Sequence, residues 1–584
     1  MATISNELNF TERTGEDIAI HKYGKEWPIV YIIYNDDEAY VGETLDARVR
    51  LRQHYDNPER RRLEYVRIIS DDTFNKSAIL DLESFLISHM ASDGRFKKGL
   101  QNGNAGLQKH NYYQKNELYE PQFKKIWEEL VNKYHLAKNE IEKIQNTNLF
   151  KYSPYKALTP DQYAVATGII KVLSEDICND EKSTFIVNGS PGTGKTILGT
   201  YLVKLFSTKV DEDTDSNDER LIENLQKIRQ KKPNLKIGLV VSMVNLRNIL
   251  KKTFKDTYGL TQSMVYGPSE IANSKETFDI LIVDEAHRLK ATRAVGAEIG
   301  SMQKNNIKLG LGKNSGTQLD WIIKKSKHQI LLYDSFQTIK KADIGAQDIR
   351  KINIASNRKF DLTTQIRCMS GGEEYINFIR SVFEGKPFEY RINISDYDFR
   401  IFDSVKEMTD LIKKKDAEKG VGLCRNIAGY GWEWKTKDKI NPQNAEETEE
   451  CIKQGNYDIE INGNKYVWNV NYDGWISSPN SVNEVGCIHT VQGFDLNYAG
   501  VIIGNELRYD KEKDELYIVR DSYYDKKGKE LANNEELMSY ILNIYYILCT
   551  RGMRGTFIYA CDDNLREYLK QSAKVLRHSL KDNV

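Results

Sequence analysis

One eight-residue stretch, Gly189–Thr196 with the sequence GSPGTGKT, restricts the possible folds of this chain more than any other feature. It fits the pattern G-x-x-x-x-G-K-[ST], and it lies between a strand-like run, TFIVN, and a helix-like run, ILGTYLVKLF. In this setting backbone N–H groups and a helix N-terminus surround phosphate groups. We therefore expect Lys195 to contact the β- and γ-phosphates of a nucleotide, and the Thr196 hydroxyl to bind Mg²⁺. The glycines that shape this loop are Gly189, Gly192 and Gly194.

Two carboxylates stand at the end of a second apolar run, FDILIVDEAH. Asp284 and Glu285 would reach the same crevice as the phosphate loop, because the carboxyl ends of parallel strands meet at one edge of a sheet. A charged group after so apolar a run costs free energy unless it takes part in binding. The pattern predicts that Asp284 holds Mg²⁺ and that Glu285 polarises the attacking water. The loop and the acidic pair together indicate an enzyme that hydrolyses a nucleoside triphosphate.

Short apolar runs alternate with helical stretches over most of the chain. STFIVNG, LKIGLVVS, FDILIVDEAH and HQILLYD form one set, and GVGLCRN, NEVGCIHT, YAGVIIG and GTFIYA form a second set after about residue 390. Runs of this kind are typical of buried parallel strands. We therefore predict an α/β fold with a small α/β block at 1–113, a helical connector at 114–155, and two parallel-sheet lobes at 156–388 and 389–584.

The amino-acid composition limits which binding partners and which cellular compartment are expected. Lys+Arg and Asp+Glu both number 84, so a surface that binds nucleic acid must be a local basic patch. The seven cysteines include no C-x-x-C pair, which argues against a zinc site or a disulfide framework and favours a cytoplasmic location. The chain has no apolar run of about 18 residues and no signal peptide pattern at its N-terminus, so we expect no membrane partner.

Five further segments resemble motifs of superfamily 1 helicases, and they occur in helicase order. ALTPDQ, which ends at Gln162, resembles the glutamine motif that reads adenine through a side-chain amide. DSFQ, with Gln337, resembles motif III, whose glutamine would sense the γ-phosphate. LTTQIRC, HTVQGFD and YYILCTRGMRG resemble motifs IV, V and VI, and they contain Arg367, Gly493 and Arg551 respectively.

The helicase resemblance covers about residues 155–575 and implies two RecA-like lobes with ATP at their interface. Arg367 and Arg551 would then reach across this interface to the γ-phosphate, where a planar guanidinium suits the spread charge. MVNLRN, GYGWEW, VGCIHTVQGFD and YYILCTRGMRG are similar to the Schlafen-type helicase family.

Five aromatic side chains would either stack on single-stranded bases or fill a core: Tyr430, Trp432, Trp434, Trp468 and Trp475.

The N-terminal block contains WPIVYIIYN and EAYVGET, whose spacing resembles that of the GIY-YIG nuclease family. Tyr31 and Tyr40 stand for the two tyrosines of that family, and Ile29 replaces its first glycine. The family places an arginine ten residues after the second tyrosine, which is Arg50 here. It places a histidine four residues later, which is His54. Because the two tyrosines lie on paired strands, we expect them to face one cleft.

Later residues of the nuclease family also have counterparts in this chain. Its metal-binding glutamate matches Glu83, and its late asparagine matches either Asn102 or Asn104. The resemblance implies phosphodiester hydrolysis by a tyrosine base, with Mg²⁺ or Mn²⁺ on Glu83 and with Arg50 stabilising the transition state. The basic run Arg60–Arg62 would either contact phosphates or form a solvated turn.

These motifs predict an ATP-dependent helicase or translocase with a metal-dependent endonuclease at its N-terminus. The expected partner is single-stranded or branched DNA, with RNA as the alternative, and the expected target is foreign DNA, such as phage genomes, or damaged DNA. A second hypothesis is an ATP-driven sensor or motor whose N-terminal block binds nucleic acid without cutting it. The sequence leaves the oligomeric state open.

Overall fold

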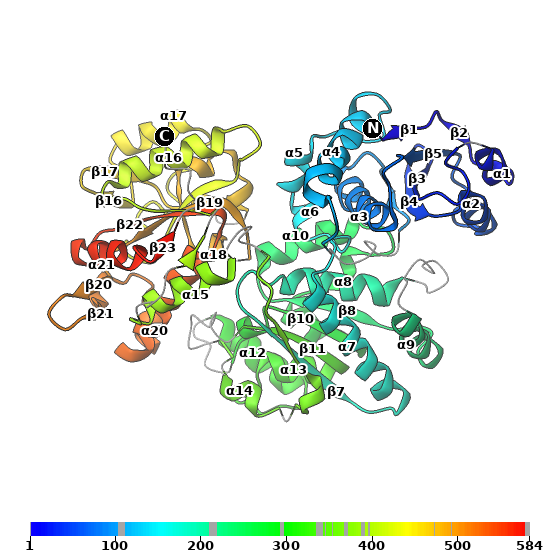
Figure 1. Ribbon diagram of the computed structural model, residues 1–584. Coiled ribbons are helices and arrows are strands. Elements are labelled where there is room, and N and C mark those ends of the chain that lie inside the picture. The colour runs from blue at the N-terminus through cyan, green and yellow to red at the C-terminus, as the bar shows by residue number, and fades with distance from the viewer. Residues whose placement is uncertain are drawn as a thin grey trace.

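The computed structural model shows three sheet-based units, an N-terminal unit and two larger lobes (Figure 1). Along the chain, helices α4, α5 and α6 come between the first unit and the second. Lobe 1 runs from α7 to β12, and lobe 2 from α15 to β23. The structure describes residues 2–20, 22–102, 111–208, 219–291, 297–334, 343–344, 346–352, 354–366, 372–386, 392–394, 397–471, 474–491 and 493–577. Within these residues no helix is long and apolar enough to cross a membrane.

A mixed sheet of order β1-β5-β3-β4-β6 forms the N-terminal unit, with β2 paired to β5. Strand β3 (Ile29–Tyr34) is buried along its whole length, because alternate side chains enter two different cores. One core lies against the helix α3 (Lys76–Asp93), and the other contains residues of α1 (Thr14–Ala19) and α2 (Ala47–Asp56). The remaining strands are β1 (Thr3–Ile4), β2 (Leu8–Asn9), β4 (Glu38–Thr44), β5 (Tyr65–Ser70) and β6 (Gly99–Leu100).

Helices α4 (Glu120–Asn132), α5 (Ile141–Gln145) and α6 (Asn148–Lys151) occupy the predicted connector. Their apolar side chains, including Trp127, belong to the same core as α3. The connector therefore packs on the N-terminal unit and does not form a separate spacer. Asn75 begins α3 by accepting a hydrogen bond from the Ala78 N–H, and Gly94 ends it in the left-handed conformation.

Lobe 1 contains a parallel sheet of order β12-β7-β11-β10-β8-β9. Its first strand, β7 (Ser183–Gly189), coincides with the predicted run STFIVNG. The other strands are β8 (Ile237–Val241), β9 (Val265–Tyr266), β10 (Phe278–Asp284), β11 (Ser326–Tyr333) and β12 (Lys359–Leu362). Its helices are α7 (Pro160–Cys178), α8 (Lys195–Ser207), α9 (Glu219–Lys231), α10 (Val244–Lys255), α11 (Pro268–Asn273), α12 (Ala297–Lys308), α13 (Gln318–Lys325) and α14 (Ala346–Arg350).

Lobe 2 contains a second parallel sheet, of order β14-β22-β19-β15-β18. These strands are β14 (Asp398–Ile401), β15 (Cys424–Ala428), β18 (Val485–Cys487), β19 (Leu496–Ile503) and β22 (Gly552–Ala560). Smaller pairs are β13 (Ile392–Asn393) with β23 (Leu576–Arg577), β16 (Ile459–Ile461) with β17 (Asn464–Tyr466), and β20 (Leu507–Asp510) with β21 (Glu515–Ile518). The expected α/β fold with two parallel sheets is confirmed.

The helices of lobe 2 show at which residue this lobe begins. They are α15 (Gly372–Phe383), α16 (Val405–Ala417), α17 (Ala445–Lys453), α18 (Ile488–Val491), α19 (Lys526–Leu531), α20 (Asn534–Cys549) and α21 (Asp563–Ala573). Tyr375 and Ile379 of α15 are buried in the same core as β19 and α20. Helix α15 therefore belongs to lobe 2, and the lobes divide before Gly372 and not at residue 388.

Candidate functional site

The phosphate loop lies at the carboxyl edge of the lobe 1 sheet, between the end of β7 and the start of α8. Gly192 and Gly194 have φ values of 87° and 75°, in the left-handed region that favours glycine. A Cβ on Gly194 would lie only 2.3 Å from Nε2 of Gln162. The loop is therefore closed tightly, and its shape depends on glycine at this position.

The buried ammonium of Lys195 is held inside the loop. It donates hydrogen bonds to the carbonyls of Gly189 at 2.6 Å and Ser190 at 3.1 Å. It also donates to Oδ2 of Asp334, which directly follows β11, at 3.2 Å. The cation is thus already placed beside the loop where phosphate oxygens would enter.

Gln162 lies on the first turn of α7 and reaches the same loop. Its Nε2 donates to the Thr193 carbonyl at 2.8 Å, and its Oε1 accepts from the Thr159 N–H at 3.0 Å in a capping box. The side chain is 1% exposed. In this structure the oxygen and the nitrogen of the Gln162 amide both make hydrogen bonds to backbone groups, so Gln162 stabilises the loop. Adenine recognition by this residue stays a prediction.

Asp284 is the last residue of β10, Glu285 follows it, and both are buried. The Thr196 hydroxyl donates to Oδ2 of Asp284 at 2.8 Å, while burial and the nearby charge of Glu285 raise the pKa of Asp284 above its usual value. Glu285 has a φ of 51°, a strained value for a residue with a side chain. Burial acts to raise its pKa, but the lowering effects of His287, Lys195 and Arg288 together outweigh burial and hold the pKa of Glu285 well below its usual range. Nε2 of His287 lies 2.8 Å from Oε2 of Glu285.

These groups fit a hard divalent cation. Within the described residues, the buried Oδ1 atom of Asp284 has no hydrogen-bond partner, and the Thr196 hydroxyl lies beside the same carboxylate. Carboxylate and hydroxyl oxygens are the ligands that Mg²⁺ takes in nucleotide sites. A bound cation would also compensate the burial that raises the pKa of Asp284.

Gly493 lies where lobe 2 meets lobe 1 and the connector. A Cβ on Gly493 would be 3.5 Å from Cδ2 of Leu246 and 3.6 Å from the methyl carbon of Met243, both in lobe 1. Its carbonyl accepts a hydrogen bond from the Tyr152 hydroxyl. Lys151 donates to the Asp495 carbonyl at 3.1 Å. The loop that resembles motif V is therefore held by the connector on one side and by lobe 1 on the other.

Arg551 contacts backbone groups of its own lobe in this structure. Its guanidinium is 1% exposed and donates to the carbonyls of Ile547 at 3.1 Å and Phe494 at 3.3 Å, both in lobe 2. These hydrogen bonds connect the loop that resembles motif V to the end of α20. The contact of Arg551 with a γ-phosphate stays a prediction. Gln337 and Arg367 lie outside the described residues.

The N-terminal unit brings three of the predicted nuclease residues, Tyr31, Tyr40 and His54, together on one face of its sheet. Ile33 pairs with Tyr40 across β3 and β4, so Tyr31 and Tyr40 share a face, and their ring centroids are 6.4 Å apart. The Tyr31 hydroxyl lies 2.6 Å from Nε2 of His54, which is 0% exposed. The charges of Arg50 and Glu83 both act on the Tyr31 hydroxyl.

Burial dominates the electrostatics of this cluster. It raises the pKa of both Tyr31 and Tyr40 far above the usual value of 10, despite the lowering effect of Arg50 and Arg60. Burial, followed by the charges of Arg60 and Arg50, lowers the pKa of His54 well below 6.5. His54 is therefore neutral at physiological pH.

Two small features explain the shape of this cluster. A Cβ on Gly42 would lie 2.3 Å from the Tyr31 hydroxyl oxygen, so the glycine after Tyr40-Val41 leaves room for that hydroxyl. Nδ2 of Asn102 donates to the Val41 carbonyl at 2.7 Å, and Oδ1 of Asn102 accepts from the Val41 N–H at 3.1 Å. These two hydrogen bonds hold β4 next to the segment that contains Asn102. Asn102 thus has a structural task, while Asn104 lies outside the described residues.

Arg60 also belongs to this cluster, which the sequence did not predict for this residue. It is 7% exposed, its Nη1 donates to Nδ1 of His54 at 2.6 Å, and its Cζ lies 4.0 Å from the Tyr40 ring centroid. The interpretation as a solvated turn is therefore wrong for Arg60, while a phosphate contact by this residue stays a prediction. Arg61 and Arg62 are exposed, as a turn requires. Three consecutive arginines give no sign of which one turns inward.

The aromatic side chains between residues 430 and 475 divide into two groups. Trp468 and Trp475 are 3% and 1% exposed and belong to the cores of lobe 2, so the core interpretation is correct for them. Tyr430, Trp432 and Trp434 pack against these cores but stay partly exposed.

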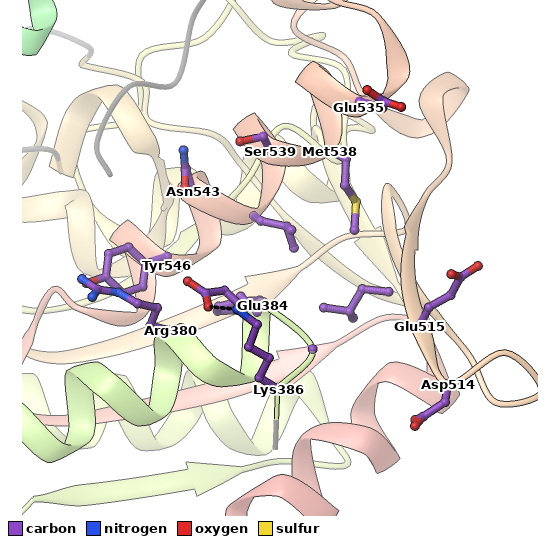
Figure 2. Close-up of a pocket in the computed structure, with 14 residues that line it drawn as sticks. Arg380, Glu384, Lys386, Asp514, Glu515, Glu535, Met538, Ser539, Asn543 and Tyr546 are labelled. Atoms are coloured by element: carbon purple, nitrogen blue, oxygen red, sulfur yellow. Dashed lines mark hydrogen bonds and ion pairs between the residues drawn. The ribbon is translucent and has the colours of Figure 1, made fainter. Parts of the chain in front are cut away.

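Lobe 2 also contains a groove of about 630 Å³ between α15, α20 and the β20–β21 hairpin (Figure 2). Arg380, Glu384 and Lys386 line one side, and Glu384 accepts a hydrogen bond of 3.1 Å from Lys386. Met538 and Tyr546 of α20 also line the groove, and Tyr546 lies beside Arg380 (Figure 2). The groove contains none of the predicted site residues, so we assign the chemistry to the phosphate loop and the N-terminal cluster.

Comparison with known proteins bears on lobes 1 and 2. Residues 182–562, more than half of the chain, match the family model described as Schlafen group 3, DNA/RNA helicase domain. The uncharacterized protein YPL245W of Saccharomyces cerevisiae (strain ATCC 204508 / S288c) is 27% identical over 429 residues, which are 67% of this chain and 84% of the yeast protein.

Two solved structures show a distant likeness. Arterivirus nonstructural protein 10 (helicase) matches 68% of this chain at 10% identity and a TM-score of 0.26, and the chain spans 63% of the viral protein's length. Bacteroides sp Pif1 in complex with ADP-AlF4 matches 69% of this chain and 96% of its own length, at 10% identity and a TM-score of 0.26. At these TM-scores the likeness decides nothing about function.

Proposed function

This chain belongs to the Schlafen group 3 DNA/RNA helicase family, and we propose that it is an ATP-driven helicase or translocase that carries a metal-dependent endonuclease in its N-terminal unit. The observation that carries the motor proposal is the hydrogen bond between Thr196 and Asp284, which joins the phosphate loop to the acidic pair. The proposed substrates are ATP and single-stranded or branched DNA, with RNA as the alternative.

The residues of lobe 1 suggest how ATP would be held and hydrolysed. Lys195 would move its hydrogen bonds from the carbonyls of Gly189 and Ser190 to the β- and γ-phosphate oxygens. Thr196 and Asp284 would hold Mg²⁺, which draws charge from the phosphate oxygens when it is bound. Glu285 stays ionised beside His287 and is suited to orient the attacking water.

ATP hydrolysis by the full-length protein tests the motor proposal, with and without single-stranded DNA or RNA. We expect nucleic acid to stimulate hydrolysis, and we expect Lys195→Ala to abolish it. Lys182→Ala is the matched control, because Lys182 is an exposed lysine just before the same strand β7. Equal hydrolysis by the Lys195→Ala and Lys182→Ala variants would rule out the assigned loop. Displacement of a labelled strand would distinguish a helicase from a translocase.

The N-terminal unit supports cleavage of a phosphodiester. Tyr31 would take a proton from the attacking water, Arg50 would stabilise the charge that develops on phosphorus, and Glu83 would hold Mg²⁺ or Mn²⁺. Glu83 is 7% exposed and lies on α3, close enough for its charge to act on Tyr31 and Tyr40. We propose foreign or damaged DNA as the target, since a motor beside a nuclease can deliver strands to be cut.

A second candidate function is binding of nucleic acid without cleavage, and one observation favours it. Burial raises the pKa of Tyr31 far above 10, which works against the phenolate that a tyrosine base requires. Incubation with plasmid and single-stranded DNA in Mg²⁺ or Mn²⁺ separates the two candidates. We expect cleavage by the wild type and by Asp81→Asn, a change of another carboxylate on α3, but none by Glu83→Gln. A wild type that binds but never cuts would establish the second function.

A further inference from the structure

We propose that Arg60 is a positioning residue that fixes the tautomer of His54, so that His54 donates a hydrogen bond to Tyr31 and cannot accept the Tyr31 proton. For its role in catalysis this inference rests on the proposed nuclease function. The hydrogen-bond pattern itself is a property of the folded N-terminal unit and can be measured without any cleavage.

The His54 ring makes one contact at each of its two nitrogens. Nη1 of Arg60 lies 2.6 Å from Nδ1, and the hydroxyl oxygen of Tyr31 lies 2.6 Å from Nε2. All three side chains are buried: Tyr31 and His54 are 0% exposed, and Arg60 is 7% exposed. The imidazole is thus held at both nitrogens by protein groups.

The chemistry of the three groups then decides where the protons are. A guanidinium only donates hydrogen bonds, so Nδ1 of His54 must present its lone pair to Arg60. A neutral imidazole carries one N–H, which must therefore be on Nε2. That N–H points to the Tyr31 oxygen, which becomes the acceptor. A charged imidazolium would place an N–H against the guanidinium N–H, and burial disfavours that state as well.

The position of Arg60 is itself fixed by a second contact. Its Cζ lies 4.0 Å from the centroid of the Tyr40 ring, in the geometry of a cation over an aromatic face. A flat guanidinium can stack on this ring and donate to His54 at the same time, whereas an ammonium has no flat face. The second tyrosine of the cluster therefore holds the arginine that orients the histidine.

This arrangement has a consequence for the proposed cleavage. With Nε2 protonated, His54 has no lone pair facing Tyr31, so a proton that Tyr31 takes from water stays on the Tyr31 oxygen. In that step Tyr31 acts as a phenolate that has already lost its own proton to solvent. An O–H bond of water breaks and the phenol O–H bond forms, while the water oxygen bonds to phosphorus and the P–O bond to the leaving oxygen breaks. The His54 N–H and the charge of Arg50 would both stabilise the phenolate before the step.

The test is a nitrogen NMR spectrum of the full-length protein labelled with ¹⁵N-histidine. The nitrogen shifts of a neutral imidazole distinguish its two tautomers, and His54→Gln identifies the His54 signals among those of the nine histidines. We expect the Nε2–H tautomer in the wild type and in Arg61→Met, an exposed neighbour. In Arg60→Met we expect the Nδ1–H tautomer to become populated. An Nδ1–H tautomer in the wild type overturns the assignment, and so does an unchanged spectrum in Arg60→Met.

Cleavage measurements then separate the failure of this inference from the failure of the nuclease proposal. We expect Arg60→Met to lower kcat by about tenfold or more with KM unchanged, and Arg60→Lys to recover part of the loss. If Arg60→Met folds poorly, the wild-type spectrum alone decides the tautomer. If the wild type never cuts but Arg60→Met changes the tautomer, the role of Arg60 stands and the nuclease proposal fails.

Discussion

The hydroxyl of Thr196 donates a hydrogen bond of 2.8 Å to Oδ2 of Asp284, which joins the first turn of α8 to the end of β10. The two side chains predicted to hold Mg²⁺ are therefore already in contact. Because α8 and β10 pack in one core of lobe 1, little rearrangement is needed when the cation and ATP arrive. The proposed Mg²⁺ site of the motor depends on this contact.

Removing the Thr196 hydroxyl should weaken catalysis of ATP hydrolysis. Valine has nearly the same shape as threonine but lacks the oxygen, so we expect Thr196→Val to lower kcat by about 100-fold and to raise the Mg²⁺ concentration that is needed. Thr196→Ser keeps the hydroxyl and is the control. Steady-state hydrolysis over a range of Mg²⁺ concentrations measures the effect, and equal rates for the two variants would contradict this role.

A side chain at Gly194 should distort the phosphate loop. Its φ of 75° and the 2.3 Å approach of a Cβ to Gln162 both oppose alanine, so we expect Gly194→Ala to weaken ATP binding by about tenfold. Gly455 has a φ of 84° but no neighbour within 4 Å of its Cβ, so Gly455→Ala brings the backbone strain without the clash. Titration with a fluorescent ATP analogue should show a loss for Gly194→Ala alone. A matching loss for Gly455→Ala would assign the effect to general strain.

The contact of Tyr152 with Gly493 should link the connector to the motor. Tyr152→Phe removes one hydrogen bond, worth about 1 kcal/mol, from the loop that lies between the connector and lobe 1. We expect nucleic-acid-stimulated ATP hydrolysis to fall about fivefold while the basal rate stays the same. Tyr113→Phe, at an exposed tyrosine, is the control. If stimulation is unchanged in Tyr152→Phe, the connector does not act on this loop.

Glu506 should make lobe 2 less stable as the pH rises. It is fully buried beside Tyr545, and burial raises its pKa from the usual 4.5 to about 7. The folded state therefore keeps the Glu506 proton to a higher pH than the unfolded state does. The contribution of Glu506 to the free energy of unfolding is fully present below about pH 4.5, and up to about 3 kcal/mol of it is lost as the pH rises through 7.

Glu506→Gln tests this pH dependence, because an amide keeps the shape and needs no proton. We expect the variant to raise the unfolding temperature by at least about 3 °C near pH 8 and to change it little near pH 5. Glu535→Gln, at an exposed position, should have no such effect. Equal shifts at both pH values would show that the carboxyl of Glu506 is not protonated in the folded protein.

Local patterns were sufficient to predict the elements that carry the chemistry. The apolar run before Gly189 became β7, and the run before Asp284 became β10, because long buried runs have few alternatives to a parallel strand. The alternation of side chains along a strand also predicted that Tyr31 and Tyr40 share a face.

Long-range contacts were not predictable in the same way. The orientation of Arg551 toward the carbonyls of Ile547 and Phe494 depends on how α20 meets the loop of motif V, which no local pattern describes. The inward turn of Arg60 depends on the position of His54 and Tyr40, which the tertiary fold alone decides. A motif shows which residue types are present, and the fold decides which atoms they face.

The most direct test compares the wild type with Lys195→Ala and Glu83→Ala in one assay, in which plasmid and single-stranded DNA are incubated with Mg²⁺, with and without ATP. We predict that Glu83→Ala loses cleavage and keeps DNA-stimulated ATP hydrolysis, and that Lys195→Ala loses ATP hydrolysis. A wild type that hydrolyses ATP on DNA but never cuts it would contradict the claim that this chain joins a nuclease to a motor.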